Sequence, residues 1–320
     1  MTSGTICVFG GTGFVGHHII SQLYADGWQV VIPSRHPQRH RDLLVQPGVS
    51  LIHITHFDDV TLKRLLKDCD VVINLIGILN ENQRTNSTFY GVHVALVRQI
   101  LKACQANGVP RLLHMSALNA DAARGPSCYL RSKGEAENIM HQANAEDLHV
   151  TSFRPSVIFG PEDSFINRFA ALLRLTPLMP LACPNARFAP VYVADVARAF
   201  VGAINNKLTF GRHYNLCGPR EYSLKELVEY TAQTAGLKRK VIGLGDGLSR
   251  LQARILEKVP GKPFTMDNYN SMKVGSICSG GCARELGLQL TPLESVVPQY
   301  LGKQTLRDRF QAYRANSDNG

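Results

Sequence analysis

Residues 8–20 read VFGGTGFVGHHII and carry three glycines at three-residue spacing, Gly10, Gly13 and Gly16. An apolar run precedes them, which predicts a buried strand, and a helical pattern follows them. A glycine loop between a strand and a helix lets the backbone approach a pyrophosphate, whose charge the helix N-terminus stabilises. The stretch therefore predicts a dinucleotide site. A glycine-rich turn without a ligand is the alternative interpretation.

Strand and helix patterns alternate from this loop to about residue 160. The expected strands are TICVFGG, WQVVIPSR (ending at Pro33), VSLIHITHF, DVVINLIGIL, RLLHMSAL and HVTSFRPSVIFG. Such alternation is typical of βαβ units with right-handed crossovers. The fourth run is apolar without alternation, as in a parallel strand covered on both faces. We expect an α/β fold with a doubly wound parallel sheet, the Rossmann arrangement.

The pattern changes beyond Gly160. Residues 187–218 return to strand, helix and an edge strand, whereas residues 161–186 and 219–305 are mainly helical with Gly- and Pro-rich loops. We expect a Rossmann core of residues 1–160 together with 187–218. A smaller, interleaved, mainly α lobe is expected at 161–186 and 219–305. Residues 306–320 are polar and are expected to form a flexible tail.

The composition favours a folded protein with an anionic ligand or surface. The chain has 320 residues, of which 44% are hydrophobic, and its 35 Lys and Arg exceed its 25 Asp and Glu by ten. Such an excess suits nucleic acid, an anionic membrane or an anionic small ligand. No aromatic–basic patch recurs, so we expect no nucleic-acid partner. The basic residues gather in two groups: Arg35, Arg39 and Arg41 with His36 and His40, and Lys303, Arg307, Arg309 and Arg314.

The eight cysteines are interpreted as reduced thiols. Several lie in apolar runs, as Cys7 and Cys217 do, and no secretory signal is visible. We therefore expect a cytoplasmic protein, with peripheral association at the inner membrane surface left open. The pair Cys278 and Cys282 lacks a second pair at metal-site spacing, so no metal is expected. No apolar stretch reaches the roughly 18–20 residues that span a bilayer.

The end of the second strand predicts which dinucleotide binds. NAD sites place an acid there to accept bonds from the adenosine ribose. This chain has Ser34 and Arg35 at that position, in PSRHPQRHR, and no acid before Asp42. An arginine can pair with a 2′-phosphate through charge-assisted bonds. We expect NADP(H) to be favoured over NAD(H); a solvated basic loop is the alternative.

Three residues are candidates for catalysis. Tyr129 and Lys133 form a Tyr-x-x-x-Lys on a predicted helix, and residues four apart share a helix face. A nearby ammonium is expected to lower the pKa of the phenol and make it a proton donor and acceptor. Ser116 ends the fifth strand, at the sheet edge where ligands bind, and can hydrogen-bond a substrate carbonyl. The alternative is a surface tyrosine beside a surface lysine.

These features resemble the extended and atypical short-chain dehydrogenase/reductases. The glycine loop, Ser116, Tyr129, Lys133 and RPSVIFGPED carry the likeness. The chain is most similar to one branch, the NADPH-carrying accessory subunit of respiratory complex I and its bacterial relatives. The segments similar to that branch are VIPSR, VVINLIG, HMSALNA, YLRSKGEAE, RPSVIFGPEDSFINRFA, PVYVADVARA and LTPLESV, spread from about residue 5 to residue 300.

The resemblance implies a nucleotide across the C-terminal edge of the sheet and a role for each matching residue. The pyrophosphate would contact Gly10, Thr12, Gly13, Phe14, Val15 and Gly16, and the 2′-phosphate Arg35. Leu75, Ile76 and Gly77 would lie along the cofactor, Lys133 would bind the nicotinamide ribose, and Pro155 and Val157 would flank the nicotinamide. Many relatives carry an adenine-binding Asp after the third strand. Asp58 lies late for that role and is not assigned.

Two functions from different classes follow. The first is an NADP(H)-dependent reductase or epimerase-like oxidoreductase with Tyr129 as acid and base, acting on an apolar or quinone-related substrate. The short interval from Ser116 to Tyr129 argues against a nucleotide sugar. The second is a non-catalytic accessory protein of a respiratory complex, in which bound NADPH stabilises the fold. The stretch LSRLQARILEKVP at 248–260 favours an apolar substrate or a partner surface. An ordinary amphipathic helix packed on the core is the alternative.

Overall fold

The computed structural model describes residues 4–82, 87–145, 147–278 and 286–302. Its main element is a seven-stranded sheet with the order β11-β6-β5-β4-β1-β2-β3, in which every neighbouring pair is parallel. The order reverses direction between β1 and β4, where ligands bind in such sheets. The strands are β1 (Thr5–Phe9), β2 (Gln29–Ser34), β3 (Val49–His53), β4 (Val71–Asn74), β5 (Arg111–Met115), β6 (His149–Pro155) and β11 (Arg212–Leu216). The expected doubly wound α/β fold is confirmed.

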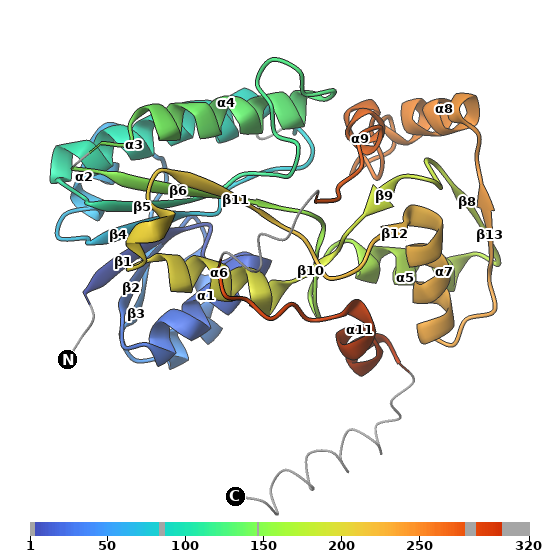
Figure 1. The fold of residues 1–320 in the computed structure, drawn as a ribbon, viewed down its shortest axis with the longest axis horizontal. Coiled ribbons are helices and arrows are strands. Elements are labelled where there is room, and N and C mark those ends of the chain that lie inside the picture. The colour runs from blue at the N-terminus through green and yellow to red at the C-terminus, as the bar shows by residue number, and fades with distance from the viewer. Residues whose placement is uncertain (1–3, 83–86, 146, 279–285, 303–320) are drawn as a thin grey trace, which may run out of the picture.

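Helices cover both faces of this sheet (Figure 1). One face carries α1 (Phe14–Ala25) and α6 (Val193–Ala203). The other carries α2 (Asp59–Leu65), α3 (Leu96–Asn107) and α4 (Cys128–Gln142), and a π-helical turn, η4 (Tyr90–Ala95), leads into α3. Because both faces are covered, strands β4 and β5 are buried along their whole length. Short 3₁₀ turns are η1 (Pro37–Arg39), η2 (Arg41–Val45) and η5 (Lys207–Thr209).

A smaller lobe lies beyond the C-terminal edge of the sheet (Figure 1). Its core is a separate cluster of apolar side chains that includes Phe159, Leu173, Val228 and Val297. Its helices are α5 (Ile166–Leu175), α7 (Leu224–Thr234), α8 (Asp246–Leu256), α9 (Met266–Met272) and α11 (Leu293–Leu301). Paired short strands complete it and link it to the sheet: β8 (Leu178–Leu181) with β13 (Lys240–Gly243), β9 (Arg187–Phe188) with β12 (Tyr222–Ser223), and β7 (Ile158–Phe159) with β10 (Val191–Tyr192).

The expected end of the second strand at Pro33 is wrong. Strand β2 continues to Ser34, and Pro33 pairs in register with Ile52 of β3. The pairing of β2 with β1 has already ended at Val31, so the missing N–H of Pro33 breaks no bond on that side.

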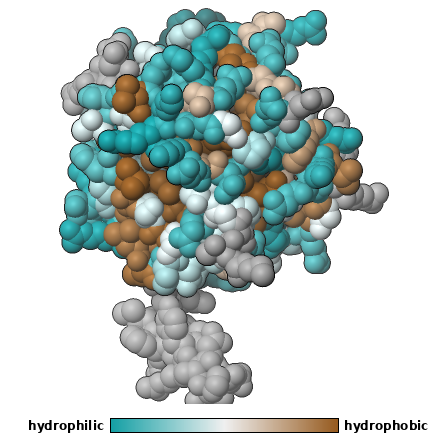
Figure 2. All heavy atoms as spheres, turned by 90° about the vertical axis from the view of Figure 1, so that its left-hand side faces the viewer, coloured by the Kyte–Doolittle hydropathy of each residue, from teal (hydrophilic) through white to brown (hydrophobic). Residues whose placement is uncertain are grey.

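Figure 2 shows the side of the molecule away from the smaller lobe, where apolar groups are interspersed with polar ones. In the described part of the chain, none of the helices combines the length and apolarity needed to cross a membrane.

Candidate functional site

Two positions of the glycine loop are too crowded for side chains, Gly10 against the residues after β4 and Gly16 against the loop itself. Gly10 has φ +76°, and a Cβ there would lie 3.2 Å from the backbone nitrogen of Ile76 and the carbonyl carbon of Leu75. A Cβ on Gly16 would lie 2.2 Å from the carbonyl oxygen of Gly11. The loop, the start of α1 and the end of β4 therefore form one tight surface at the switch point, with Leu75, Ile76 and Gly77 along it.

The N-terminus of α1 is open for an anion. Gly13 is its N-cap, no side chain caps it, and its first turn holds no acid. The first N–H groups of a helix have no partner within the helix, so those of Phe14, Val15 and Gly16 suit a pyrophosphate. Thr12 lies partly exposed at the same turn, and the Phe14 ring packs where a Cβ on Gly160 would lie, 3.0 Å from its Cζ. These residues fit a dinucleotide.

The basic loop after β2 leaves Arg35 available. Ser34 is buried, and its hydroxyl accepts a hydrogen bond of 3.2 Å from the backbone N–H of His36. Arg35 is exposed, and no carboxylate of the described residues forms an ion pair with it. Asp58, which was not assigned to adenine, caps α2 by accepting a 2.8 Å bond from the N–H of Thr61.

The side chain of Lys133 is buried beside Ile76 and Gly77, the residues after β4. Its ammonium donates a 2.9 Å hydrogen bond to the carbonyl of Met115 and lies 3.5 Å from the carbonyl of Ile76. A Cβ on Gly77 would lie 3.0 Å from its Nζ, so a side chain at Gly77 would displace it. Burial lowers the pKa of Lys133 to about 8, although the carboxylate of Glu137 acts in the opposite direction.

Tyr129 differs from the expectation in one property. Its ring packs edge-on against Phe89 and His93, with ring centroids 6.0 and 5.6 Å away. Burial raises the pKa of Tyr129 to about 12. The expected lowering is therefore wrong for this structure, because loss of hydration outweighs any effect of the lysine, whose ammonium is bonded to backbone carbonyls. The phenol is a proton donor here rather than a phenolate.

His93 connects the segment after β4 to α4, and the sequence patterns did not predict this role. Its Nε2 accepts a 3.0 Å bond from the N–H of Ile78, and its Nδ1 lies 2.8 Å from the hydroxyl of Ser132. That hydroxyl in turn donates to the carbonyl of Tyr129. Burial lowers the pKa of His93 to about 3, so the ring is neutral and Nδ1 carries the proton. A single histidine inside a helical pattern gave no signal of this role.

Ser116 directly follows β5, at the expected edge of the sheet, but its hydroxyl has another partner. It is buried and donates a 2.5 Å hydrogen bond to Oε2 of Glu137. Glu137 is buried too and pairs with the guanidinium of Arg154, at 2.7 Å from Nη2. In this structure the hydroxyl therefore belongs to a buried ionic network, and binding of a substrate carbonyl by Ser116 stays a prediction.

The ligand atoms of Glu137, His141 and His213 lie within 4.8 Å of one another. Such a cluster can hold a metal ion when its donor atoms are free. Here both carboxylate oxygens of Glu137 accept hydrogen bonds from the Arg154 guanidinium. Its Oε2 also accepts a hydrogen bond from the hydroxyl of Ser116. His141 is bonded to the hydroxyl of Ser152. Because the Arg154 guanidinium already pairs with the carboxylate of Glu137, the cluster of these three residues does not fit a metal ion.

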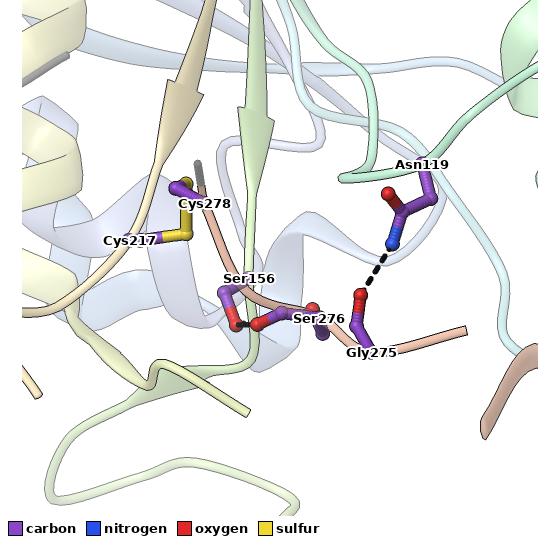
Figure 3. The surroundings of a disulfide bond; sticks show 6 residues. All are labelled: Asn119, Ser156, Cys217, Gly275, Ser276 and Cys278. Carbon is purple, nitrogen blue, oxygen red and sulfur yellow. Dashed lines mark hydrogen bonds between the residues drawn. A yellow bond between two sulfur atoms is a disulfide. The ribbon is translucent and has the colours of Figure 1, made fainter. Parts of the chain in front are cut away.

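A strap at residues 275–278 runs past Ser156, which lies between Pro155 and Val157 in the sequence (Figure 3). The hydroxyl of Ser156 donates a 2.7 Å hydrogen bond to the carbonyl of Ser276. On the other side, the amide of Asn119 donates a 2.7 Å bond to the carbonyl of Gly275. The strap thus joins the loop after β5 to the segment that holds Pro155 and Val157, the residues expected at the nicotinamide.

Cys278 of this strap forms a disulfide with Cys217, which follows β11. The expectation that all cysteines are reduced thiols is wrong for this pair. The fold brings two residues 61 positions apart to a Cα–Cα distance of 6.1 Å, which is suitable for a disulfide. Cys282, the other residue considered for a metal, lies outside the described residues, as do Lys303, Arg307, Arg309 and Arg314.

Residues 6–217 match the model of the NAD dependent epimerase/dehydratase family. The chain belongs to this family. Together with the parallel sheet described above, this membership makes the chain a nicotinamide dinucleotide-binding protein of the Rossmann type. The match ends at Cys217, so it covers the sheet and α1 to α6 but not helices α7 to α11 of the smaller lobe.

Individual relatives of this epimerase/dehydratase chain include subunits of a respiratory enzyme and reductases. It is 35% identical over 235 residues to NADH dehydrogenase (ubiquinone) 1 alpha subcomplex subunit 9, mitochondrial, of Mus musculus, covering 71% of this chain and 60% of the mouse protein. It is 28% identical to a ceramide reductase of Caulobacter vibrioides, over 76% of this chain and 74% of that protein. An NADPH-dependent quinone oxidoreductase of Escherichia coli, solved with NADPH, shares the fold with TM-score 0.72 and 19% identity, over 92% of this chain and 98% of that one.

Proposed function

We propose that the protein binds NADP(H) and reduces a carbonyl group of an apolar, quinone-related or lipid-like substrate. The observation that carries the cofactor choice is the exposed Arg35 at the end of β2, where no acid stands and no carboxylate of the described residues forms an ion pair with it. A 2′-phosphate supplies the anion that this guanidinium lacks. One relative is named as a ceramide reductase, and one structural neighbour as a quinone oxidoreductase. Both names support an apolar substrate.

Each site residue then has a defined task. The glycine loop and the open N-terminus of α1 hold the pyrophosphate, while Leu75, Ile76 and Gly77 lie along the cofactor. Pro155 and Val157 flank the nicotinamide, and the Lys133 ammonium, beside Ile76 and Gly77, binds the ribose. When bound, the nicotinamide supplies or accepts the hydride. Tyr129 holds a proton on its phenol at neutral pH, because burial raises its pKa to about 12, and donates it to the substrate oxygen.

A second candidate is a non-catalytic accessory protein that bound NADPH stabilises. The observation that favours it is the engagement of Ser116 by Glu137, which leaves Tyr129 without a free serine hydroxyl beside it to hold a substrate. The mitochondrial relatives are named as NADH dehydrogenase subunits, which supports a respiratory-complex partner. For either function we propose contact with the inner membrane surface. The cytoplasmic location was expected from reduced cysteines, and the disulfide between Cys217 and Cys278 removes that support.

Titration of nucleotide-free protein with NADPH and NADH tests the cofactor. We expect tighter binding of NADPH, and we expect Arg35→Ala to weaken it roughly tenfold to hundredfold, the effect of losing a charge-assisted bond. NADH affinity should not change. Arg64→Ala, which removes an exposed arginine from α2, is the control. Equal affinities of the two nucleotides for the parent protein would contradict the NADP(H) proposal.

Tyr129→Phe separates the two candidate functions. It removes only the hydroxyl, and we expect unchanged NADPH affinity. With quinones and long-chain ketones as substrates, the reductase requires turnover by the parent protein and a loss of roughly a hundredfold or more in the variant. Absence of turnover in the parent protein, together with NADPH-dependent thermal stabilisation and a respiratory subunit among copurified proteins, would favour the accessory function.

A further inference from the structure

Helix α8 exposes its large apolar side chains, whereas an ordinary surface helix buries them. Its buried residues are Ser249 and Ala253, two small side chains. Its large apolar side chains face solvent instead: Leu248 is 57% exposed, Leu251 50% and Ile255 56%. Most amphipathic helices bury such residues to gain stability. The alternative that residues 248–260 simply pack on the core is therefore wrong for this helix.

The exposed apolar residues form one continuous stripe. Leu248, Leu251 and Ile255 are three and four positions apart, so they lie on the same face of the helix, and exposed Val259 extends the series beyond its end. Figure 1 places α8 at the outer margin of the smaller lobe, where it packs on α9. The stripe therefore faces solvent at this margin of the lobe.

Hydrogen bonds on the opposite side of α8 keep the apolar stripe facing solvent. The hydroxyl of Ser249 accepts a 3.1 Å bond from the N–H of Cys183 and donates to the carbonyl of Leu244. The amide of Gln252 donates a 3.1 Å bond to the carbonyl of Pro180. Rolling the helix to bury Leu251 would break these bonds and leave the polar groups that they satisfy without partners.

Basic side chains follow the stripe along one side. Arg250, Arg254 and Lys258 are spaced by four residues, are exposed, and lie next to the apolar face. No ion pair joins them to a carboxylate in the part of the chain that the structure describes. Asp246, at the start of the helix, already accepts a hydrogen bond from the hydroxyl of Tyr269. The row of cations therefore lacks an anionic partner.

We propose that α8 docks the protein on an anionic lipid membrane, with the stripe in the boundary between headgroups and acyl chains. A helix that combines an apolar face with a basic one lies in that boundary, where arginine and lysine reach lipid phosphates. The exposed cations beside the stripe, which form no ion pair among the described residues, complement the phosphates of such a membrane. This site is separate from the nucleotide site and does not depend on the proposed reaction.

Sedimentation of the full chain with vesicles tests the proposal. We expect binding to vesicles of phosphatidylcholine mixed with phosphatidylglycerol, and much weaker binding to phosphatidylcholine alone. Leu251→Ser/Ile255→Ser should reduce binding by about tenfold or more, because less apolar area is buried. Arg254→Gln/Lys258→Gln should reduce it by about fivefold for each charge removed. NADPH affinity and the unfolding temperature report whether each variant is folded.

The matched control is Val60→Ser/Leu208→Ser, which removes two exposed apolar side chains from α2 and η5. It should bind vesicles as the parent protein does. Failure of the parent protein to bind anionic vesicles, or equal loss in the control and α8 variants, would overturn the proposal. So would a dimer that Leu251→Ser/Ile255→Ser dissociates without any vesicle binding, since the stripe would then be an interface between two copies.

Discussion

The Ser116 hydroxyl donates a hydrogen bond of 2.5 Å to the carboxylate of Glu137, which lies on α4 one turn after Lys133. Both residues are buried, and Arg154 of β6 neutralises the carboxylate. This contact ties the end of β5 to the helix that carries Tyr129 and Lys133. It makes the serine a part of the scaffold under the site, whatever further role it has toward a substrate.

Ser116→Ala is expected to lower the free energy of unfolding by roughly 1.5–3 kcal/mol, the range for a hydrogen bond to a charged group. Urea unfolding measures this change. Ser295→Ala, at an exposed position on α11, is the control and should change stability little. If unfolding of Ser116→Ala matches that of the parent protein, the bond to Glu137 contributes nothing to the scaffold.

The buried Lys133 should make stability depend on pH. The folded chain loses this proton at about pH 8, whereas an exposed lysine loses it at its usual value of 10.5. Between these values the unfolded chain binds more protons, so stability rises with pH in that window. Below it both states are charged, and the cost of burying the charge, roughly 3 kcal/mol at 1.36 kcal/mol per pKa unit, is fully present.

Lys133→Met removes this contribution without removing bulk. Urea unfolding of nucleotide-free protein at about pH 7.5 and 9.5 should show the parent protein gaining roughly 2 kcal/mol relative to the variant. Buried cysteines and tyrosines, whose pKa values are raised, titrate in both proteins and cancel in the difference. Parallel pH dependence of the two proteins would show that Lys133 is not perturbed by burial.

Gly16→Ala should abolish tight NADPH binding. The added Cβ would lie 2.2 Å from the carbonyl oxygen of Gly11, so the glycine loop or the start of α1 must move away from the pyrophosphate position. Gly202→Ala on α6 is a matched control, because a Cβ there meets nothing within 4 Å. That control should gain roughly 0.5–1 kcal/mol of stability and bind NADPH normally. Normal nucleotide binding by Gly16→Ala would contradict the close packing of loop and helix.

Reduction of the disulfide should destabilise the protein. Cross-linking residues 61 positions apart restricts the unfolded chain, which typically stabilises a protein by about 2–4 kcal/mol. Urea unfolding of Cys217→Ser/Cys278→Ser should show that loss, and Cys128→Ser, which removes an exposed free thiol, should not. Thiol labelling of the unreduced, unfolded parent protein should leave Cys217 and Cys278 unlabelled. Labelling of both would show that the disulfide does not form.

Local patterns were sufficient to predict the glycine loop between β1 and α1. The apolar run before Gly10, the glycine spacing and the helical pattern after Gly16 lie within fifteen residues, and each requires a backbone geometry that does not depend on distant parts of the chain. The parallel sheet could be predicted in the same way, because strands separated by helix-length segments form βαβ units with right-handed crossovers. Tyr129 and Lys133 share one face of α4, because residues four positions apart in a helix are neighbours on its surface.

The sequence by itself thus determined the sheet and the position of its nucleotide loop, because these depend on neighbours along the chain. Only the tertiary structure decided which group each polar side chain meets: Ser116 meets Glu137, Lys133 meets the carbonyl of Met115, and Cys217 meets Cys278. It also decided which side of α8 is buried. The periodicity of that helix is the same whichever face turns inward, and only packing against its neighbours selects one.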